Sequence, residues 1–162
     1  NKLNEKITIH QLPLTDEKNQ HLIMNESEFI EGWSMNTFGS NINYNGNSFM
    51  PKQSYKIFGT NVDTLVQQKI LQEPQYLKID VDGIEHKILS GAINLLKKES
   101  VKSILIELNE NYKDQYNLII KLMKNCNFSI KSKFPVDLSK NKSKFNYMFN
   151  YLFEKNETKN IR

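Results

Sequence analysis

The sequence YLKIDVDGIEHKILSG occupies residues 76–91, and its character changes halfway along. Its first part is an apolar run bounded by turn residues, which predicts a buried strand over 76–81. Apolar residues then recur at helical spacing, which predicts a helix over 83–98. Carboxylates cluster between the two, in residues 80–85, which we call the acidic turn. Charged side chains are rarely buried without a partner, so the acidic turn needs a ligand, a capping role or solvent.

Similar strand and helix patterns occur before and after residues 76–91. A second apolar run predicts a buried strand over 101–108, and helical patterns predict helices over 60–71 and 111–125. Residues 26–53 are rich in glycine, asparagine and serine, which predicts a long irregular segment. Further strands are expected over 7–14, 21–25, 54–59, 128–134 and 145–155.

This order of elements predicts an α/β fold. Strands that alternate with helices are joined by right-handed crossovers and form a largely parallel sheet. We expect the strands at 76–81 and 101–108 to be adjacent and parallel, with helix 83–98 as their crossover. The last two strands have no helix between them, so we expect an antiparallel hairpin at the sheet edge. Ligands bind such sheets at the carboxyl ends of the strands, here the acidic turn, residues 107–109 and the loop after Leu12.

The acidic turn has a structural explanation and a chemical one. Asp82 is placed to cap the following helix, and Glu85 lies three residues on, at the spacing of a capping box. Asp80 ends the strand and has no such role. Its carboxylate is suited to hold a divalent cation, to orient a sulfonium or ammonium group, or to act as a base. The Asp-x-Asp pattern also suggests a metal-dependent glycosyltransferase. His86, at the start of the predicted helix, is expected to be a surface or capping residue.

The composition and charge of the chain argue against several classes of function. The 162 residues carry a net charge of +4, but the basic residues are scattered and the only arginine is Arg162, so we expect no nucleic-acid partner. No apolar run is long enough to span a bilayer, and no signal-peptide pattern is present. The single cysteine, Cys126, forms no intramolecular disulfide and is expected to be buried. A single cysteine fits a reducing compartment, so we expect a cytoplasmic protein. No histidine pair has metal-ligand spacing, so we expect no metal site.

YLKIDVDGIEHKILSGAINLL, followed by ILIELNE, resembles the FkbM family of S-adenosylmethionine-dependent methyltransferases. That family has an apolar strand ending in Lys-Ile-Asp-Val-Glu-Gly-x-Glu, then a helix containing Gly-Ala, then a strand ending in glutamate. Asp82 stands where the family usually has glutamate. The likeness covers most of residues 54–155, and the positions that match the pattern are Lys78, Ile79, Asp80, Val81, Gly83, Glu85, Leu89, Gly91, Ala92 and Glu107.

The resemblance implies a Rossmann-like class I methyltransferase sheet, mostly parallel, with an antiparallel C-terminal hairpin. The family's first two strands and glycine-rich cofactor loop have no counterpart here. We therefore expect the N-terminal strands to be missing, residues 1–155 to form a partial methyltransferase domain, and residues 156–162 to be a polar tail. An exposed sheet edge would then favour a homo-oligomer.

The resemblance also implies roles for particular residues. S-adenosylmethionine is the expected cofactor, with Leu12, Pro13, Leu14 and Asp80 as its binding residues. The expected catalytic residues are Asp80, Glu85 and Glu107. Residues 32–48, including Trp33, Ser34 and Phe38, are expected to form a lid on the acceptor side.

The implied reaction is O-methylation of a hydroxyl group on a saccharide or a secondary metabolite. The expected partner is thus a small-molecule or saccharide acceptor. Two alternatives stay open at this point: a metal-dependent glycosyltransferase fragment that uses the Asp-x-Asp, and a non-catalytic interaction domain.

Overall fold

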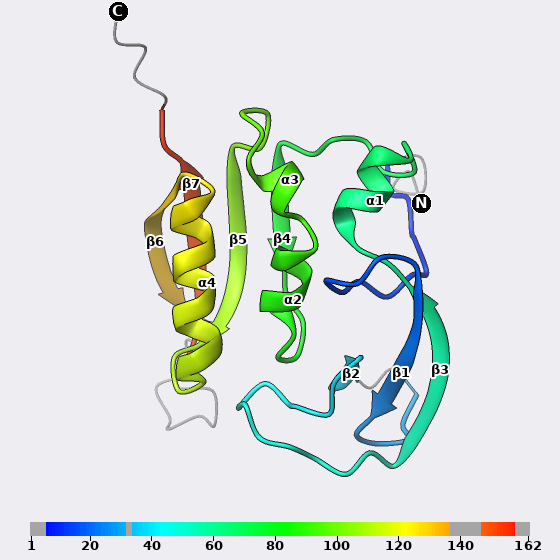
Figure 1. Cartoon of the computed structure of the whole chain (residues 1–162). Helices are drawn as coiled ribbons and strands as arrows, with labels where there is room; N and C mark the ends of the chain where they lie inside the picture. Colours follow the sequence, from blue (N-terminus) through cyan, green and yellow to red (C-terminus); the bar gives the residue numbers. More distant parts are fainter. Residues whose placement is uncertain (1–5, 32–33, 137–146, 158–162) are drawn as a thin grey trace, which may run out of the picture.

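The computed structural model describes residues 6–31, 34–136 and 147–157, which fold into two sheets and a layer of helices (Figure 1). The smaller sheet has the order β2-β1-β3 and is antiparallel; its strands are β1 (Gln20–Glu26), β2 (Asn36–Phe38) and β3 (Gln53–Gly59). The larger sheet has the order β4-β5-β7-β6, made of β4 (Tyr76–Ile79), β5 (Ser103–Asn109), β6 (Phe128–Pro135) and β7 (Met148–Lys155). The helices are α1 (Val62–Gln67), α2 (Glu85–Ser90), α3 (Ile93–Leu96) and α4 (Lys113–Asn125).

The larger sheet confirms the predicted pairing around the acidic turn. β4 and β5 are adjacent and parallel, with Ile79 opposite Ile106, and α2 and α3 lie on the crossover between them. The predicted C-terminal hairpin is also confirmed, because β6 and β7 pair antiparallel. The first two residues of the expected strand at 145–155 lie outside the described residues, as do Gly32 and Trp33 of the expected lid.

The prediction of a mostly parallel sheet was wrong for the described strands. In the larger sheet only β4 and β5 run parallel, whereas β7 pairs antiparallel with both β5 and β6. The reason lies in the order of the strands: α4 leads to β6, and β7 then pairs between β5 and β6. The smaller sheet is antiparallel throughout, because its strands are joined without helical crossovers.

Two predicted elements differ from the structure. Residues 7–14 do not form a strand, and Leu14 makes only an isolated parallel bridge to Thr60. The end of the segment meets the chain just beyond β3, where the Thr15 N–H donates to the Thr60 carbonyl oxygen and the Thr60 N–H donates to the Pro13 carbonyl oxygen. The helix predicted over 83–98 is divided into α2 and α3 at Gly91, whose backbone is so close to Thr15 that a Cβ would lie 2.3 Å from the Thr15 carbonyl oxygen.

The structure also shows how α1 begins and whether any described helix could span a membrane. Asn61 caps α1, and its Oδ1 accepts a hydrogen bond from the Thr64 N–H at 2.9 Å. Within the part of the chain that the structure describes, none of the helices has both the length and the apolar character needed to cross a bilayer.

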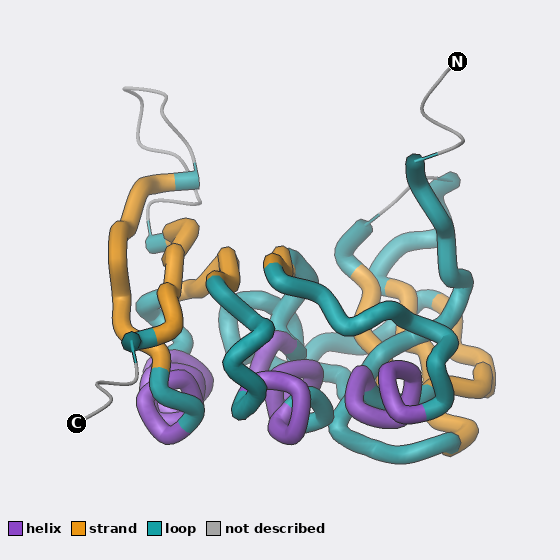
Figure 2. Tube along the Cα trace, turned by 90° about the horizontal axis from the view of Figure 1, so that it is seen from above, coloured by secondary structure: helices purple, strands orange, loops and turns teal. Residues whose placement is uncertain are grey.

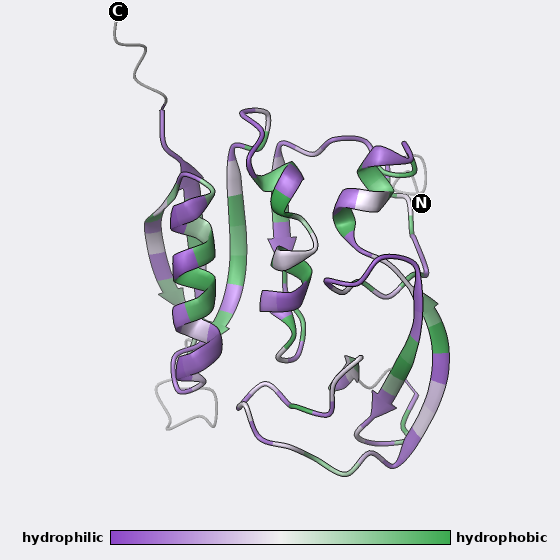
Figure 3. Ribbon diagram, in the orientation of Figure 1, coloured by the Kyte–Doolittle hydropathy of each residue, from purple (hydrophilic) through white to green (hydrophobic). Residues whose placement is uncertain are grey.

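The core lies between the larger sheet and the helices, which Figure 2 shows gathered on one side of the strands. Along β5 the buried residues alternate with half-buried ones, because successive side chains of a strand point to opposite faces. Figure 3 shows the apolar character of β5 and of the inner side of α4. The residues that fill this core include Leu89, Leu96, Ile104, Ile106, Leu108, Ile119, Met123 and the predicted Cys126.

β4 is less buried than its apolar sequence suggested. Only Ile79 of its four residues is buried, and Tyr76 is 69% exposed. β4 is the end strand in the order of the larger sheet, so in this structure one of its edges is not covered by a strand. The carboxyl end of β4 is therefore accessible, and the acidic turn follows directly from it.

Candidate functional site

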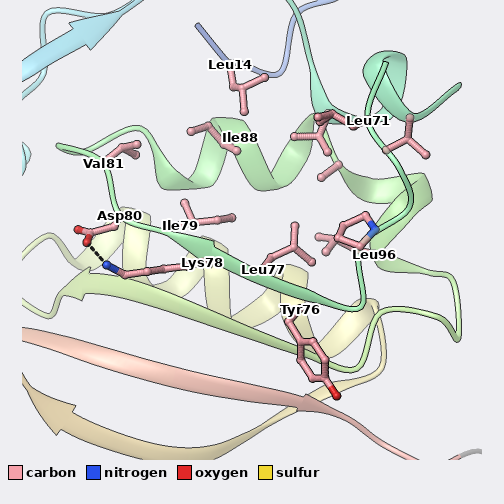
Figure 4. A pocket seen from close by; sticks show the side chains of 14 residues that line it. Leu14, Leu71, Tyr76, Leu77, Lys78, Ile79, Asp80, Val81, Ile88 and Leu96 are labelled. Atoms are coloured by element: carbon pink, nitrogen blue, oxygen red, sulfur yellow. Dashed lines mark hydrogen bonds and ion pairs between the residues drawn. The ribbon is translucent and has the colours of Figure 1, made fainter. Parts of the chain in front are cut away.

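Asp80 directly follows β4, at the carboxyl end of the strand, where the sequence predicted a ligand-binding residue (Figure 4). Its carboxylate makes an ion pair with Lys78 Nζ at 2.5 Å, and its side chain is 43% exposed. Lys78 and Asp80 are two residues apart and so project from the same face of the strand. Because an exposed pair of this kind is worth only about 0–1 kcal/mol, Asp80 remains available for a ligand.

Glu107 comes from the neighbouring strand β5 and lies at the same end of the sheet. Its immediate neighbour Ile106 pairs with Ile79, which brings Glu107 alongside Asp80. The Glu107 side chain is half-buried, and burial raises its pKa, with the charges of Asp80 and Asp82 adding to the rise. Three carboxylates, those of Asp80, Asp82 and Glu107, thus lie near one another at the carboxyl ends of β4 and β5.

Asp82 does not cap the helix, and that prediction was wrong. Helix α2 begins at Glu85 with Ile84 as its N-cap residue, and no side chain caps it. Gly83 has a φ of +101°, and this backbone turn moves the helix start beyond the reach of Asp82. Asp82 is half-buried, and burial, together with the charge of Asp80, raises its pKa to about 6.

Glu85 is the most deeply buried carboxylate of the acidic turn, with only 4% of its surface exposed. Its Oε1 accepts a hydrogen bond from the Gly83 N–H at 3.3 Å, and its Oε2 accepts one from Gln115 Nε2 at 2.8 Å. Burial raises its pKa to about 7, although these hydrogen bonds oppose the rise. Glu85 therefore links the Gly83 backbone of the turn to Gln115 through buried hydrogen bonds.

Gln115 is a residue of this site that sequence reasoning missed. It lies on α4, is 4% exposed, and donates from Nε2 to the Gly83 carbonyl oxygen at 2.8 Å as well as to Glu85. Its Nε2 also lies 3.0 Å from Nδ1 of His86, which is half-buried rather than on the surface. The available signal was a polar residue on the apolar stripe of helix 111–125, between Tyr112 and Ile119 in sequence.

The predicted cofactor-binding residues line two apolar cavities beside β4. The first has a volume of about 430 Å³, and Figure 4 shows Leu14 and Ile88 facing β4 across it, with Asp80 at the carboxyl end of the strand. The second, of about 370 Å³, is lined by Leu12, Pro13 and Leu14 together with Val81 and Ile88. Leu14, Val81 and Ile88 line both cavities, so the loop after Leu12 and the end of β4 border one apolar region.

Two residues of the expected lid have different surroundings. Ser34 is exposed, whereas Phe38 is 2% exposed and packs so closely on Gly59 that a Cβ there would lie 2.5 Å from the Phe38 ring. Phe38 therefore belongs to the core, and its assignment to a lid was wrong. Among the residues that the structure describes, no group of three histidine, cysteine, aspartate or glutamate side chains is arranged to hold a metal ion.

The comparisons with known proteins identify one family. The family model for the methyltransferase FkbM domain matches residues 3–130. This span includes the loop after Leu12, the acidic turn, Glu107 and Gln115. Searches of curated proteins and of solved structures found no match. The family match gives no support to the glycosyltransferase alternative.

Proposed function

Because the chain belongs to the FkbM methyltransferase family, we propose that it transfers a methyl group from S-adenosylmethionine to a hydroxyl group of a saccharide or a secondary metabolite. The observation that carries this proposal is the family match over the segment that contains the acidic turn. The arrangement of the site supports it, because carboxylates lie next to a large apolar region.

The residues beside β4 fit S-adenosylmethionine. When bound, the cofactor supplies a methyl group on a positively charged sulfonium. Leu12, Pro13 and Leu14 offer an apolar surface for the adenine base, as expected for cofactor pockets. Asp80 borders the apolar region, and its negative charge attracts a cation across a short distance. We therefore assign these four residues to cofactor binding.

The other two predicted catalytic residues, Glu107 and Glu85, have distinct proposed roles. Glu107 lies beside Asp80, and its half-buried carboxylate is suited to orient the acceptor by accepting a hydrogen bond from a hydroxyl. Glu85 is buried, and both of its oxygens accept hydrogen bonds, so its proposed contribution to catalysis is to position the acidic turn. This division suits a methyl transfer, in which alignment of donor and acceptor supplies much of the rate.

Calorimetric titration with S-adenosylmethionine and with S-adenosylhomocysteine tests the proposal. We expect both to bind, and the Asp80→Asn variant to lose at least tenfold in affinity for the cationic donor but less for the uncharged product. The melting temperature should stay nearly unchanged, because the Lys78 pair is exposed. Asp114→Asn, an exposed position in the first turn of α4, is the matched control and should bind both like the parent chain. Failure of both compounds to bind would refute the proposal.

A further inference from the structure

A third cavity, of about 220 Å³, lies between the acidic turn and residues 34–52, which we call the covering segment. Asp82 is the residue of the acidic turn that lines it. The other walls combine apolar and polar side chains: Ser27, Glu28, Met35, Thr37, Asn43, Tyr44, Phe49, Met50 and Lys52. This cavity shares no lining residue with the apolar region assigned to the cofactor, but Asp82 directly follows Val81, which lines that region.

The covering segment is fastened to the end of β5 by hydrogen bonds. Asn109, the last residue of β5, is 5% exposed, and its Nδ2 donates to the Tyr44 carbonyl oxygen at 3.0 Å. The same amide group donates to Asn45 Oδ1 at 2.9 Å. A buried side chain from the larger sheet thus holds a segment that precedes it by more than 60 residues.

Close backbone contact joins the covering segment to the acidic turn as well. At Gly83 a Cβ atom would lie 2.7 Å from the Asn43 carbonyl oxygen, so the two backbones approach as closely as only glycine permits. Lys87 Nζ on α2 also donates to the Gly39 carbonyl oxygen at 3.0 Å. Hydrogen bonds and close backbone packing therefore fix the position of the covering segment over the acidic turn.

Asp82 is the chemically distinctive group in this cavity. Within residues 6–31, 34–136 and 147–157, no hydrogen-bond donor contacts its carboxylate, although the side chain is half-buried. Two other polar groups of the lining are engaged: Thr37 Oγ1 donates to the Ser40 carbonyl oxygen, and Asn43 Oδ1 accepts from the Asn45 and Asn47 N–H groups. The pKa of Asp82, raised by burial and by Asp80, suits a base that works near neutral pH.

We propose that this cavity binds a hydroxyl-bearing pyranose ring of the acceptor and that Asp82 accepts the proton of the hydroxyl that is methylated. This inference rests on the proposed function. The acceptor oxygen forms a bond to the methyl carbon as the carbon–sulfur bond of the sulfonium donor breaks, and the electron pair of that bond stays on sulfur. The hydroxyl proton passes to the Asp82 carboxylate, so atoms and charges balance.

The shape and lining of the cavity suggest the acceptor class. Met35, Phe49 and Met50 offer apolar contact to the C–H face of a sugar ring, while Asp82 accepts a hydrogen bond from a hydroxyl. The volume is below the roughly 300–1,000 Å³ of pockets that enclose a whole drug-sized ligand. One ring fits inside, and the remainder of a larger acceptor extends beyond the cavity.

Methionine methyl NMR tests the location of the acceptor. Met35 and Met50 line the cavity, whereas Met123 and Met148 are buried elsewhere in the larger sheet region and serve as internal controls. The probes are the methyl glycosides of glucose, galactose, mannose and rhamnose at millimolar concentration, added to the full chain saturated with S-adenosylhomocysteine. We expect at least one glycoside to shift the Met35 and Met50 signals and to leave the two controls unchanged.

The outcomes separate this inference from the proposed function. Binding of S-adenosylhomocysteine without any glycoside response at Met35 and Met50 would overturn the acceptor cavity alone. Glycoside shifts there without cofactor binding would support the sugar site and overturn the proposed methyl donor. A chain that binds neither would overturn both.

Two variants complete the test. Asp82→Asn should keep S-adenosylhomocysteine affinity within about twofold and keep the glycoside-induced shifts, but should lower methyl transfer by roughly 100-fold or more, as expected on loss of a general base. Met35→Trp should fill the cavity and abolish the glycoside response at Met50, while unchanged Met123 and Met148 signals report an intact fold. Full methyl transfer by Asp82→Asn would overturn its role as the base, and an undiminished Met50 response in Met35→Trp would overturn the location.

Discussion

The buried Glu85 side chain should make the protein less stable as the pH rises. Its pKa is raised from an ordinary value of 4.5 to about 7 by burial. Below pH 4.5 the carboxyl group is protonated in both the folded and the unfolded chain and creates no difference. Between about pH 4.5 and 7 the folded chain holds a proton that the unfolded chain has released, so the free energy of unfolding falls.

The structure sets the size of this effect. A shift of about 2.5 pKa units at about 1.4 kcal/mol per unit corresponds to roughly 3 kcal/mol, which is lost over this pH range. Little screening by solvent is expected, because Glu85 is 4% exposed. The loss is a large share of the total stability, since domains unfold at a cost of only about 5–15 kcal/mol.

Urea denaturation of the parent chain and the Glu85→Gln variant between pH 4.5 and 8 isolates this contribution. Glutamine does not titrate, and the other ionisable groups are common to both chains. Any constant change in hydrogen bonding to Gly83 or Gln115 adds the same offset at each pH. We expect the difference in unfolding free energy to shift by roughly 3 kcal/mol in favour of the variant as the pH rises. A difference that stays constant across this range would refute the reasoning.

Three further predictions concern the surroundings of the acidic turn. Gln115→Ala should lower the free energy of unfolding by about 2 kcal/mol at pH 8, because Glu85 and the Gly83 carbonyl lose a buried donor. Urea titration measures this loss. Asn117→Ala, at an exposed position of the same helix, is the control and should change the free energy of unfolding little. Gly83→Ala should destabilise the chain by more than about 1 kcal/mol in thermal melts, because of its φ of +101° and the close Asn43 carbonyl, and an unchanged melting temperature would contradict this. The uncovered edge of β4 should promote self-association, seen as concentration-dependent sedimentation, and a single monomeric species at all concentrations would argue against it.

Sequence periodicity predicted the parts of the fold that local patterns determine. The apolar runs at 76–81 and 101–108, separated by a helical pattern, identified the parallel pair β4 and β5 with its crossover. The order of those elements also located Asp80 at the carboxyl end of a strand. The absence of a helical pattern after residue 128 identified the C-terminal hairpin.

Contacts between distant segments were beyond such reasoning. Whether an alternating segment such as 7–14 forms a strand depends on backbone pairing with a distant segment, and among the described residues its bridge is the single one between Leu14 and Thr60. Capping geometry at Asp82 depended on the φ of Gly83, which is set by the approach of Asn43. Gln115 reaches the acidic turn from α4, and no spacing in one sequence reveals a hydrogen bond across 30 residues.

The position of β7 in the middle of the larger sheet constrains how the protein is made. β7 is the last of the described strands in sequence, yet it joins β5 to β6 and contributes the buried residues Tyr151 and Phe153. During synthesis, β5 and β6 emerge from the ribosome without the strand that connects them, and their facing edges stay unpaired. The sheet is completed only after residues 148–155 have been translated and released from the exit tunnel. A premature stop codon shortly before Met148 would therefore remove the centre of the sheet and leave a nascent chain for chaperones and proteases to clear.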